Sequence, residues 1–319
     1  MGYGEYDLRA HEAATKARAE RLPEQIFAQG QCHPTMNPYG VKVRESRDSA
    51  QHPDSVGVIF ALDVSGSMGE IPVQLATKTL PSFMEGVSTV LPDAQVMFMA
   101  VGNGHTDRAP LQVGQFESEA SRIDQWLERM YLEGQGGGLC ESYCLAMHFA
   151  ARHTAMDCLE KRGRKGYLFI TGDEPPFAWL APDVLAKVVG DTIPEKVLIH
   201  EMITEVSRSF YTFFLIPDRA RADQHETGII WSRLLHERAV VLDTPEDTAL
   251  ACALLVGVQE GALRSAAAIE KHASERHGRT GEARDRVVRA VLPFVEAIAR
   301  GPIAPPDVLG TRVVTGVKG

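Results

Sequence analysis

From residue 55 onward, short apolar runs alternate along the chain with longer amphipathic stretches. The apolar runs predict strands over residues 56–62, 95–101, 111–116, 167–171, 210–216 and 239–242. The amphipathic stretches predict helices over residues 71–91, 117–131, 140–159, 181–190 and 195–209, the first kinked or divided at Pro81. Strands that alternate with helices form a parallel sheet covered on both faces. We therefore predict an α/β fold with a doubly wound, mainly parallel sheet and helices on both faces over residues 55–245.

The two ends of the chain differ from this alternating region. Residues 1–54 are expected to be an amino-terminal extension, with a helix over 8–22 followed by a polar segment that three prolines interrupt. Residues 246–319 are expected to be a helical carboxyl-terminal extension, with helices over 246–257, from there to about 277, and over 284–300. The last segment, 301–319, contains Pro and Gly and is expected to be loose.

The composition limits the partners. The 319 residues include 42 acidic and 33 basic side chains, and the formal net charge of −9 argues against attraction to nucleic acid or anionic membranes. No apolar run reaches the roughly 18 residues of a membrane span, and the first residues lack the pattern of a secretory signal. The five cysteines have no disulfide-framework spacing. We therefore expect a cytoplasmic protein with free thiols and neither a nucleic-acid nor a membrane partner.

One apolar run ends in three oxygen-bearing side chains. Asp63, Ser65 and Ser67 follow the strand predicted over residues 56–62, with glycines between and after them. Open α/β sheets bind ligands at the carboxyl ends of their strands, and carboxylate, hydroxyl and water oxygens are ligands that Mg²⁺ accepts. The pattern therefore indicates a divalent-metal loop. The alternative is a polar turn whose side chains cap the helix that follows.

Two further loops carry oxygen ligands. Glu141 and Ser142 follow a glycine cluster and begin a predicted helix, while Asp173 and Glu174 follow the apolar run 167–171. Taken alone, Glu141 would complement a helix dipole, and the acidic pair would be a solvated turn. Because a parallel sheet brings the carboxyl ends of its strands to one edge, we expect the three loops to converge on one cation.

These motifs resemble the von Willebrand factor type A (VWA) family and its metal-ion-dependent adhesion site. In that family the first loop has the form D-x-S-x-S, which Asp63, Ser65 and Ser67 match, and an Asp follows a later buried strand, which Asp173 matches. The resemblance covers about residues 55–245. It implies a Mg²⁺ or Mn²⁺ held partly through water, with one coordination position left for a carboxylate of a protein partner.

The chain departs from the family at the second loop. Leu139 stands about where the family has a Thr, and a Leu side chain cannot bind a cation. The resemblance therefore implies a variant site, in which Glu141, Ser142 or a water replaces the Thr, or a site that no longer binds metal. The residues expected beside these ligands are Glu174, Asn103 and Asp107.

A second kind of metal site would lie on one predicted helix. Cys140, Cys144 and His148 recur every four residues and would supply three zinc ligands. No C-x-x-C pair supports zinc, and buried cysteine is a common core residue, so core packing is the favoured interpretation. His105 and Asp107 follow the second strand, where they would serve acid–base chemistry or simply cap a surface turn.

The sequence favours a binding module over an enzyme, since it contains neither a nucleophile elbow nor a Walker phosphate loop. We expect a cytoplasmic, metal-dependent protein-interaction module. By resemblance to intracellular VWA proteins, an AAA-type ATPase would be its partner. The alternatives are a metal-dependent hydrolase of a phosphorylated or acyl substrate, with His105, Asp107 or Glu174 as general base, and a structural subunit with a metal-free site.

Overall fold

A central six-stranded sheet organises the part of the chain that the computed structural model describes, namely residues 27, 29–75, 80–133, 138–301 and 303. The strand order is β10-β9-β6-β2-β3-β4, and every neighbouring pair is parallel except β3 with β4. The strands are β2 (Val56–Asp63), β3 (Ala94–Val101), β4 (Leu111–Val113), β6 (Gly166–Thr171), β9 (Phe210–Ile216) and β10 (Ala239–Val241). The predicted α/β fold with a mainly parallel sheet is confirmed.

One face of the sheet carries a row of aromatic rings. Four adjacent strands place a phenylalanine at the same level, in the order Phe98, Phe60, Phe169 and Phe213. Cross-strand partners share a face of the sheet, so these rings form one continuous apolar strip. Phe83 of α4 (Leu80–Ser88) packs edge to face on Phe60 and Phe169, and Phe294 of α14 (Gly281–Arg300) packs on Phe213.

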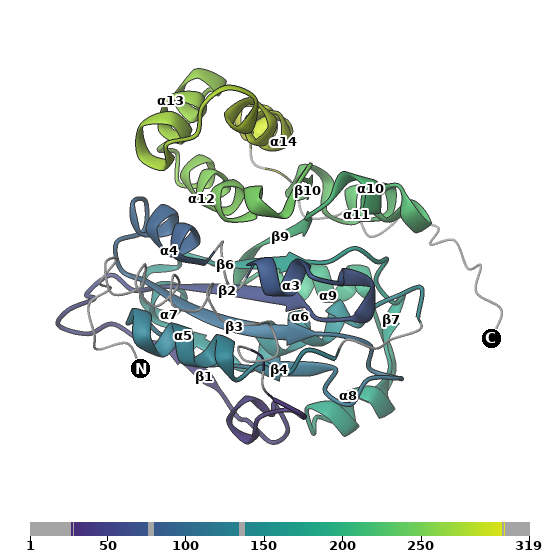
Figure 1. The fold of residues 1–319 in the computed structure, drawn as a ribbon. Coiled ribbons are helices and arrows are strands. Elements are labelled where there is room, and N and C mark those ends of the chain that lie inside the picture. The colour runs from purple at the N-terminus through teal and green to yellow at the C-terminus, as the bar shows by residue number, and fades with distance from the viewer. Residues whose placement is uncertain (1–26, 28, 76–79, 134–137, 302, 304–319) are drawn as a thin grey trace.

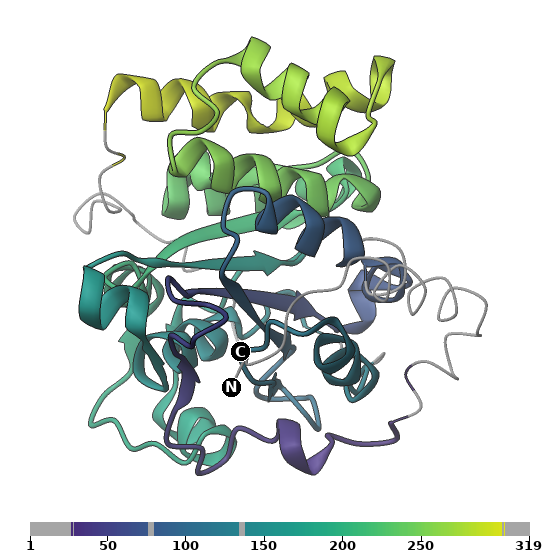
Figure 2. The same ribbon diagram turned by 90° about the vertical axis from the view of Figure 1, so that its left-hand side faces the viewer.

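Helices cover both faces (Figures 1 and 2). On the aromatic side lie α4, α12 (Thr248–Gln259), α13 (Ala266–His277) and α14. Residues 248–258 of α12 are buried all round because α4 packs on one side of the helix and α14 on the other. On the opposite side lie α6 (Tyr143–Arg152) and α9 (Ile199–Val206), which pack on each other and on the sheet.

The C-terminal helices are joined by a buried ion pair. Asp247 ends the short 3-10 helix before α12, and its side chain is 1% exposed. Arg286 of α14 donates two hydrogen bonds to it, at 2.5 and 3.1 Å, and Arg279 lies 3.7 Å away. A buried carboxylate is stable only when it is paired in this way.

None of the helices in the described part of the chain is both long and apolar enough to cross a membrane.

The remaining elements connect these layers. The helices are α3 (Ile71–Gln74), α5 (Ala120–Glu128), α7 (Asp157–Arg162), α8 (Pro182–Val188), α10 (Arg219–Ala222) and α11 (Thr227–Leu235). The 3-10 turns are η1 (Pro34–Met36), η2 (Gly66–Met68), η4 (Gln224–Glu226), η5 (His236–Arg238) and η6 (Pro245–Asp247). Two short antiparallel strands, β7 (Trp179–Leu180) and β8 (Val197–Leu198), pair outside the main sheet.

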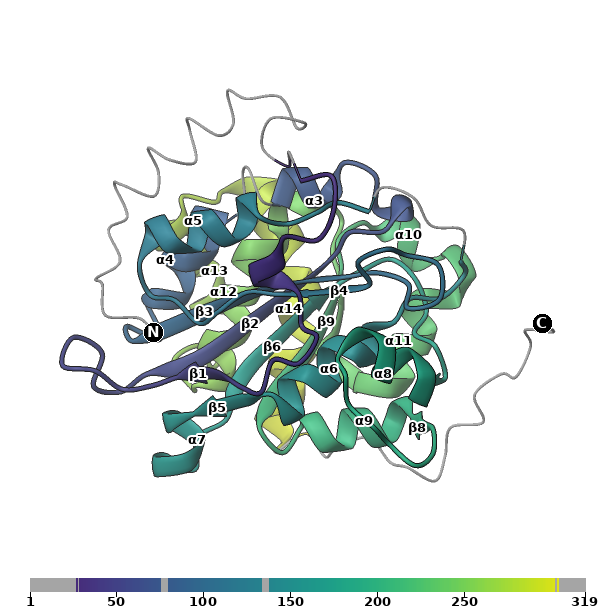
Figure 3. The ribbon, with the colours of Figure 1, turned by 90° about the horizontal axis from the view of Figure 1, so that it is seen from below.

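The predicted helix over 140–159 is wrong in its second half. Helix α6 ends at Arg152, and the chain then forms a short strand, β5 (Thr154–Met156), before α7 begins. The partner of β5 is β1 (Arg44–Ser46), a strand of the amino-terminal segment that pairs with it in parallel (Figure 3). A long-range pairing therefore overrides the local helical pattern, and the segment expected to be irregular supplies the strand.

Two other expectations concern helix breaks and the chain ends. Within the stretch 71–91 the described residues form α3 and α4, and Pro81 is the second described residue of α4; residues 76–79 lie outside the described part of the chain, so the kink or division at Pro81 stays a prediction. The helix expected over 8–22 and most of the segment 301–319 lie outside the described residues.

Candidate functional site

Asp63 is the last residue of β2 and is fully buried at the carboxyl edge of the central sheet. The chain turns back at once, so the backbone N–H and the hydroxyl of Ser65 both donate to Asp63 Oδ1, at 2.9 and 2.5 Å. A buried carboxylate needs such donors because it has left water. The turn continues into η2, which carries Ser67.

Ser67 connects the first loop, which carries Asp63 and Ser65, to the third loop, which carries Asp173 and Glu174. Its hydroxyl lies 3.0 Å from Ser65 Oγ and donates to Asp173 Oδ1 at 2.9 Å. Asp173 follows β6, the strand that pairs with β2, and this pairing brings together residues 106 positions apart. Four predicted ligands, Asp63, Ser65, Ser67 and Asp173, thus form one hydrogen-bonded chain.

Glu141 and Glu174 lie beside this chain but are not hydrogen-bonded into it. Each has one buried carboxyl oxygen, Oε2, without a hydrogen-bond partner among the described residues. Burial, reinforced by the charge of Asp63, raises the pKa of Glu141 to about 9. Burial and the charge of Asp173 raise the pKa of Glu174 to about 7. The Glu141 N–H donates to the carbonyl of Pro175 at 3.0 Å, so the second and third loops are adjacent.

Asn103, Asp107 and Ser142 form a separate network behind the second loop. The Asn103 side-chain amide donates to the backbone of the second loop at 2.9 Å, and Asp107 Oδ2 accepts from the Asn103 N–H at 2.8 Å. Ser142 Oγ accepts from the Gly104 N–H at 2.8 Å. Within the described ranges, no hydrogen bond links these three side chains to the first loop, so their predicted place beside the cation stays a prediction.

Tyr143 is a site residue that the sequence analysis did not identify. It begins α6, is fully buried, and donates through its hydroxyl to Asp63 Oδ2 at 2.6 Å. Its ring packs edge to face on Phe214 and Trp231, which fix its position. Burial and the charge of Asp63 raise the pKa of Tyr143, so the phenol stays protonated and acts as a donor. Its only signal in the sequence was its place directly after the second loop.

Arg221 of α10 was also missed. Its guanidinium donates to Asp173 Oδ2 and to the backbone carbonyl of Ser67. It therefore brings one positive charge to the acidic edge. No spacing in the sequence indicated this contact, because α10 follows β9, which lies two strands away from β2.

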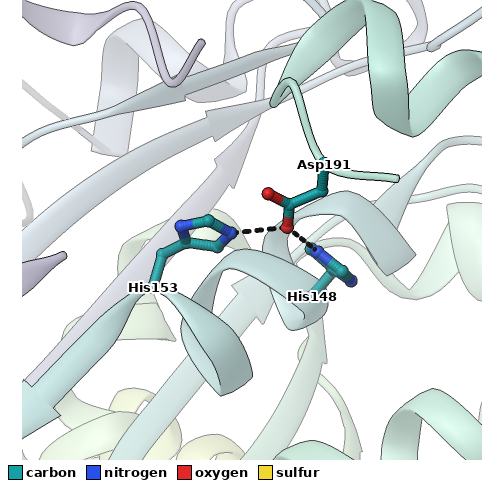
Figure 4. Close-up of side chains that lie close together, drawn as sticks. All are labelled: His148, His153 and Asp191. Carbon is teal, nitrogen blue, oxygen red and sulfur yellow. Dashed lines mark hydrogen bonds and ion pairs between the residues drawn. The ribbon is translucent and has the colours of Figure 1, made fainter. Parts of the chain in front are cut away.

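Other predicted residues lie apart from this chain. Leu139 is 56% exposed, and His105 is exposed and packs edge to face on Phe177. The part of the chain that the structure describes contains one group of three or more His, Cys, Asp or Glu side chains that lie close enough to share an ion. This group includes neither Cys140 nor Cys144 of the zinc site considered above. It consists of His148, His153 and Asp191 (Figure 4).

The donor set around Asp63 fits a small divalent cation. Two carboxylates and two hydroxyls are hard oxygen ligands of the kind that Mg²⁺ and Mn²⁺ accept. Burial, followed by repulsion from Asp173, raises the pKa of Asp63 to about 7. Buried negative charges that repel one another are costly, and Arg221 supplies only one compensating charge. A divalent cation would remove much of this cost.

Comparison with known proteins yields distant similarities of fold. No protein-family model matches the sequence, and no curated protein is significantly similar to it. The pilus adhesin SpaC from Lactobacillus rhamnosus GG matches with 13% sequence identity and a TM-score of 0.42, over 71% of this chain and 31% of the adhesin. The vWF domain of the type V pili tip protein Mfa5 from Porphyromonas gingivalis matches with 9% sequence identity and a TM-score of 0.43, over 66% of this chain and 97% of that domain. The SpRpn10 VWA domain matches with 10% sequence identity and a TM-score of 0.37, over 58% of this chain and 86% of that domain.

The chain thus spans about a third of the adhesin's length, and similarities at this level carry no function. The sheet of this chain is more informative. Five parallel strands, one antiparallel edge strand and helices on both faces surround a D-x-S-x-S loop at the carboxyl end of a central strand. The chain therefore has a VWA-like α/β fold, as its sequence resemblance predicted.

Proposed function

We propose that this chain is a metal-dependent protein-interaction module. Asp63, Ser65, Ser67 and Asp173 would hold a Mg²⁺ or Mn²⁺ at the carboxyl edge of the sheet. Glu141 and Glu174 lie next to it, and Ser142 is the remaining candidate ligand. The bound cation would supply a positive centre that accepts an acidic side chain of a protein partner.

The hydrogen bond between Ser67 Oγ and Asp173 Oδ1, at 2.9 Å, is the observation that carries this proposal. It joins the first and third loops, so that two hydroxyls and two carboxylates share one edge. Most of this set is buried, with Asp63 0% and Asp173 3% exposed, and buried carboxylates are retained at a cost unless they are paired or bind a cation. A purely structural turn would not need this concentration of acidic groups.

The cation itself is tested by calorimetric titration of the purified chain with Mg²⁺ and with Mn²⁺. We expect one equivalent to bind, and binding to be lost in Asp63→Asn and in Asp173→Asn. Asp183→Asn is the matched control, because Asp183 is an exposed carboxylate at the start of α8, outside the site. If the wild type and Asp63→Asn take up the cation equally, the Asp63 loop is not the site.

The partner is proposed to be a protein that presents an acidic residue, in the cytoplasm, with an AAA-type ATPase as the class to test first. This class comes from family resemblance alone. Capture from the native cell in Mg²⁺ should be lost on adding EDTA and in Asp63→Asn. Mass spectrometry of the captured protein then identifies its class, and an acidic-to-amide substitution in that protein should abolish capture.

One observation favours a second candidate, a metal-dependent hydrolase. The pKa of Glu174 is raised to about 7, which suits a general base at neutral pH. Mg²⁺-dependent turnover of generic phosphoester or ester substrates, lost in both Asp63→Asn and Glu174→Gln, would support this alternative. Turnover in neither the wild type nor the variants, together with metal-dependent capture, would support the binding module.

A further inference from the structure

A second cluster of titratable side chains lies at the far end of α6 from the Asp63 loop. His148 is fully buried in α6, His153 follows the last residue of that helix, and Asp191 lies in the loop after α8. One oxygen of Asp191, Oδ2, is 2.7 Å from Nε2 of His148 and 2.7 Å from Nε2 of His153 (Figure 4). The two imidazoles thus converge on a single carboxylate.

The tautomer of His153 is fixed by the amino-terminal segment. Its Nδ1 lies 2.8 Å from the carbonyl oxygen of Val41 and 3.2 Å from that of Lys42. A carbonyl oxygen can only accept, so Nδ1 carries a proton, and Nε2 is the ring atom that faces Asp191. The close contact between Nε2 and the carboxylate needs a positive species, which is either a second ring proton or a metal ion. A backbone carbonyl bound to the far nitrogen is also the usual way in which proteins orient a metal-binding histidine.

We propose that His148, His153 and Asp191 form a binding site for a transition-metal dication of the Zn²⁺ class. The two Nε2 atoms and the Asp191 carboxylate supply two nitrogen ligands and one oxygen ligand, which is the donor set of a three-ligand zinc site with an open position. Asp191 is partly exposed, with 31% of its side chain accessible, so solvent can fill the fourth position. Histidine ligands select this class of metal over Mg²⁺.

The donor atoms of the three side chains lie within 4.8 Å of one another, and a shared ion requires them to rearrange. With metal–ligand distances of about 2.0–2.2 Å, tetrahedral ligands lie about 3.3 Å apart, against the 2.7 Å seen between the ring nitrogens and Asp191. Asp191 follows Gly190, whose φ of +90° marks a turn, so it belongs to a loop and not to a helix or strand.

The site would join three parts of the chain. The ligands come from α6 and from the loop after α8, and the hydrogen bond from His153 reaches the amino-terminal segment that leads into β1. The Gly40 N–H donates to Val189 O at 2.9 Å, so this segment also contacts the end of α8 directly. A metal ion here would therefore hold residues 40–46 against the α/β core.

Zn²⁺ or Co²⁺ alone is the probe, added to the purified full chain. We expect one equivalent of Zn²⁺ to bind in Asp63→Asn as tightly as in the wild type, and Co²⁺ to give visible absorption bands of a low-coordinate N/O site. Asp191→Asn and His153→Gln should each weaken binding by more than about 100-fold, since loss of even an orienting partner costs 10- to 100-fold. His200→Gln, on α9, is the matched control.

A second measurement separates this site from adventitious surface binding. Zn²⁺ should slow amide hydrogen exchange in residues 41–46 of the wild type but not of Asp191→Asn. Because Asp191 is partly exposed, its amide variant should fold, as circular dichroism will show. Absence of Zn²⁺ binding to the wild type, or equal binding to Asp191→Asn, would overturn the proposal. Loss of Zn²⁺ binding in Cys140→Ser would also overturn it, because the ion would then be bound by Cys140.

Discussion

Arg221 donates to Asp173 at the same edge of the sheet where Ser67 donates to the other oxygen of that carboxylate. The chain thus brings its own cation to a predicted metal ligand. Asp173 is 3% exposed, so the charge–charge contact is only weakly screened by water. Any metal bound by this edge shares Asp173 with Arg221 or displaces the guanidinium.

Removal of Arg221 should therefore change metal affinity. In Arg221→Gln we expect Mg²⁺ to bind about tenfold more tightly, because a charged hydrogen bond contributes about 1.5–3 kcal/mol and no longer competes for Asp173. Arg219→Gln is the control, since Arg219 pairs with Asp243 instead. Calorimetric titration measures both. Weaker binding in Arg221→Gln would mean that the guanidinium holds the first loop in its binding conformation.

Tyr143→Phe should destabilise the fold without changing its shape. The variant leaves Asp63 buried with one hydrogen-bond donor fewer, which costs about 1–3 kcal/mol in the free energy of unfolding. Urea unfolding measures the loss. Tyr131→Phe serves as the comparison, because Tyr131 bonds Gln112 through its backbone. An unchanged free energy of unfolding in Tyr143→Phe would show that the donor to Asp63 is dispensable.

Asp247→Asn should loosen the C-terminal helices. Asp247 has a 1% exposed side chain and pairs with Arg286 of α14, and removal of one partner of a buried pair costs about 3 kcal/mol or more. Glu282→Gln is the matched control, because the Glu282–Arg289 pair is largely exposed and should contribute less than about 1 kcal/mol. Thermal unfolding of the two variants against the wild type gives the comparison. Equal losses would contradict this account.

Acid should weaken the contact between α13 and α4 through His277. Burial, followed by the charges of His272 and Arg279, lowers the pKa of His277 to about 4. The unfolded chain, with a histidine pKa of about 6.5, binds more protons than the folded chain between pH 6.5 and 4, so stability falls as pH drops through that window. Because the ring is partly exposed, the loss should be about 1–2 kcal/mol.

The measurement for His277 is urea unfolding at pH 7 and at pH 4.5. His277→Gln should lose less stability between the two values than the wild type does. His225→Gln, at an exposed histidine, should follow the wild type. If all three proteins show the same dependence on pH, the partly buried ring of His277 is not the source.

The features that the sequence predicted correctly are those that depend on residues close together in the chain. Strand β2 and the D-x-S-x-S loop are continuous in the chain, and β6 with Asp173 repeats the same arrangement, so their approach follows from parallel pairing alone. Helices α5, α8 and α9 likewise fall within the ranges that the hydrophobic periodicity predicted.

The contacts that were missed all depend on tertiary structure. Tyr143 lies 80 positions from Asp63, and Arg221 lies 48 positions from Asp173, each in a helix whose placement depends on the packed sheet. The strand β5 was missed because its partner lies in a segment that reads as irregular. His148 and His153 are five residues apart, which is not a helical spacing, and they meet only because α6 ends between them.

The pairing of β1 with β5 has a mechanical consequence. The strand Arg44–Ser46 pairs not with a strand of the central sheet but with β5, at the corner between α6 and α7, where Arg47 adds an ion pair to Asp157 at 2.9 Å. A tension applied at the amino-terminal side would reach the contacts of Gly40 with Val189 and of Val41 with His153, and then this three-residue ladder, before it reached β2. These contacts would break before those of β2, and the six-stranded sheet would stay intact under the load.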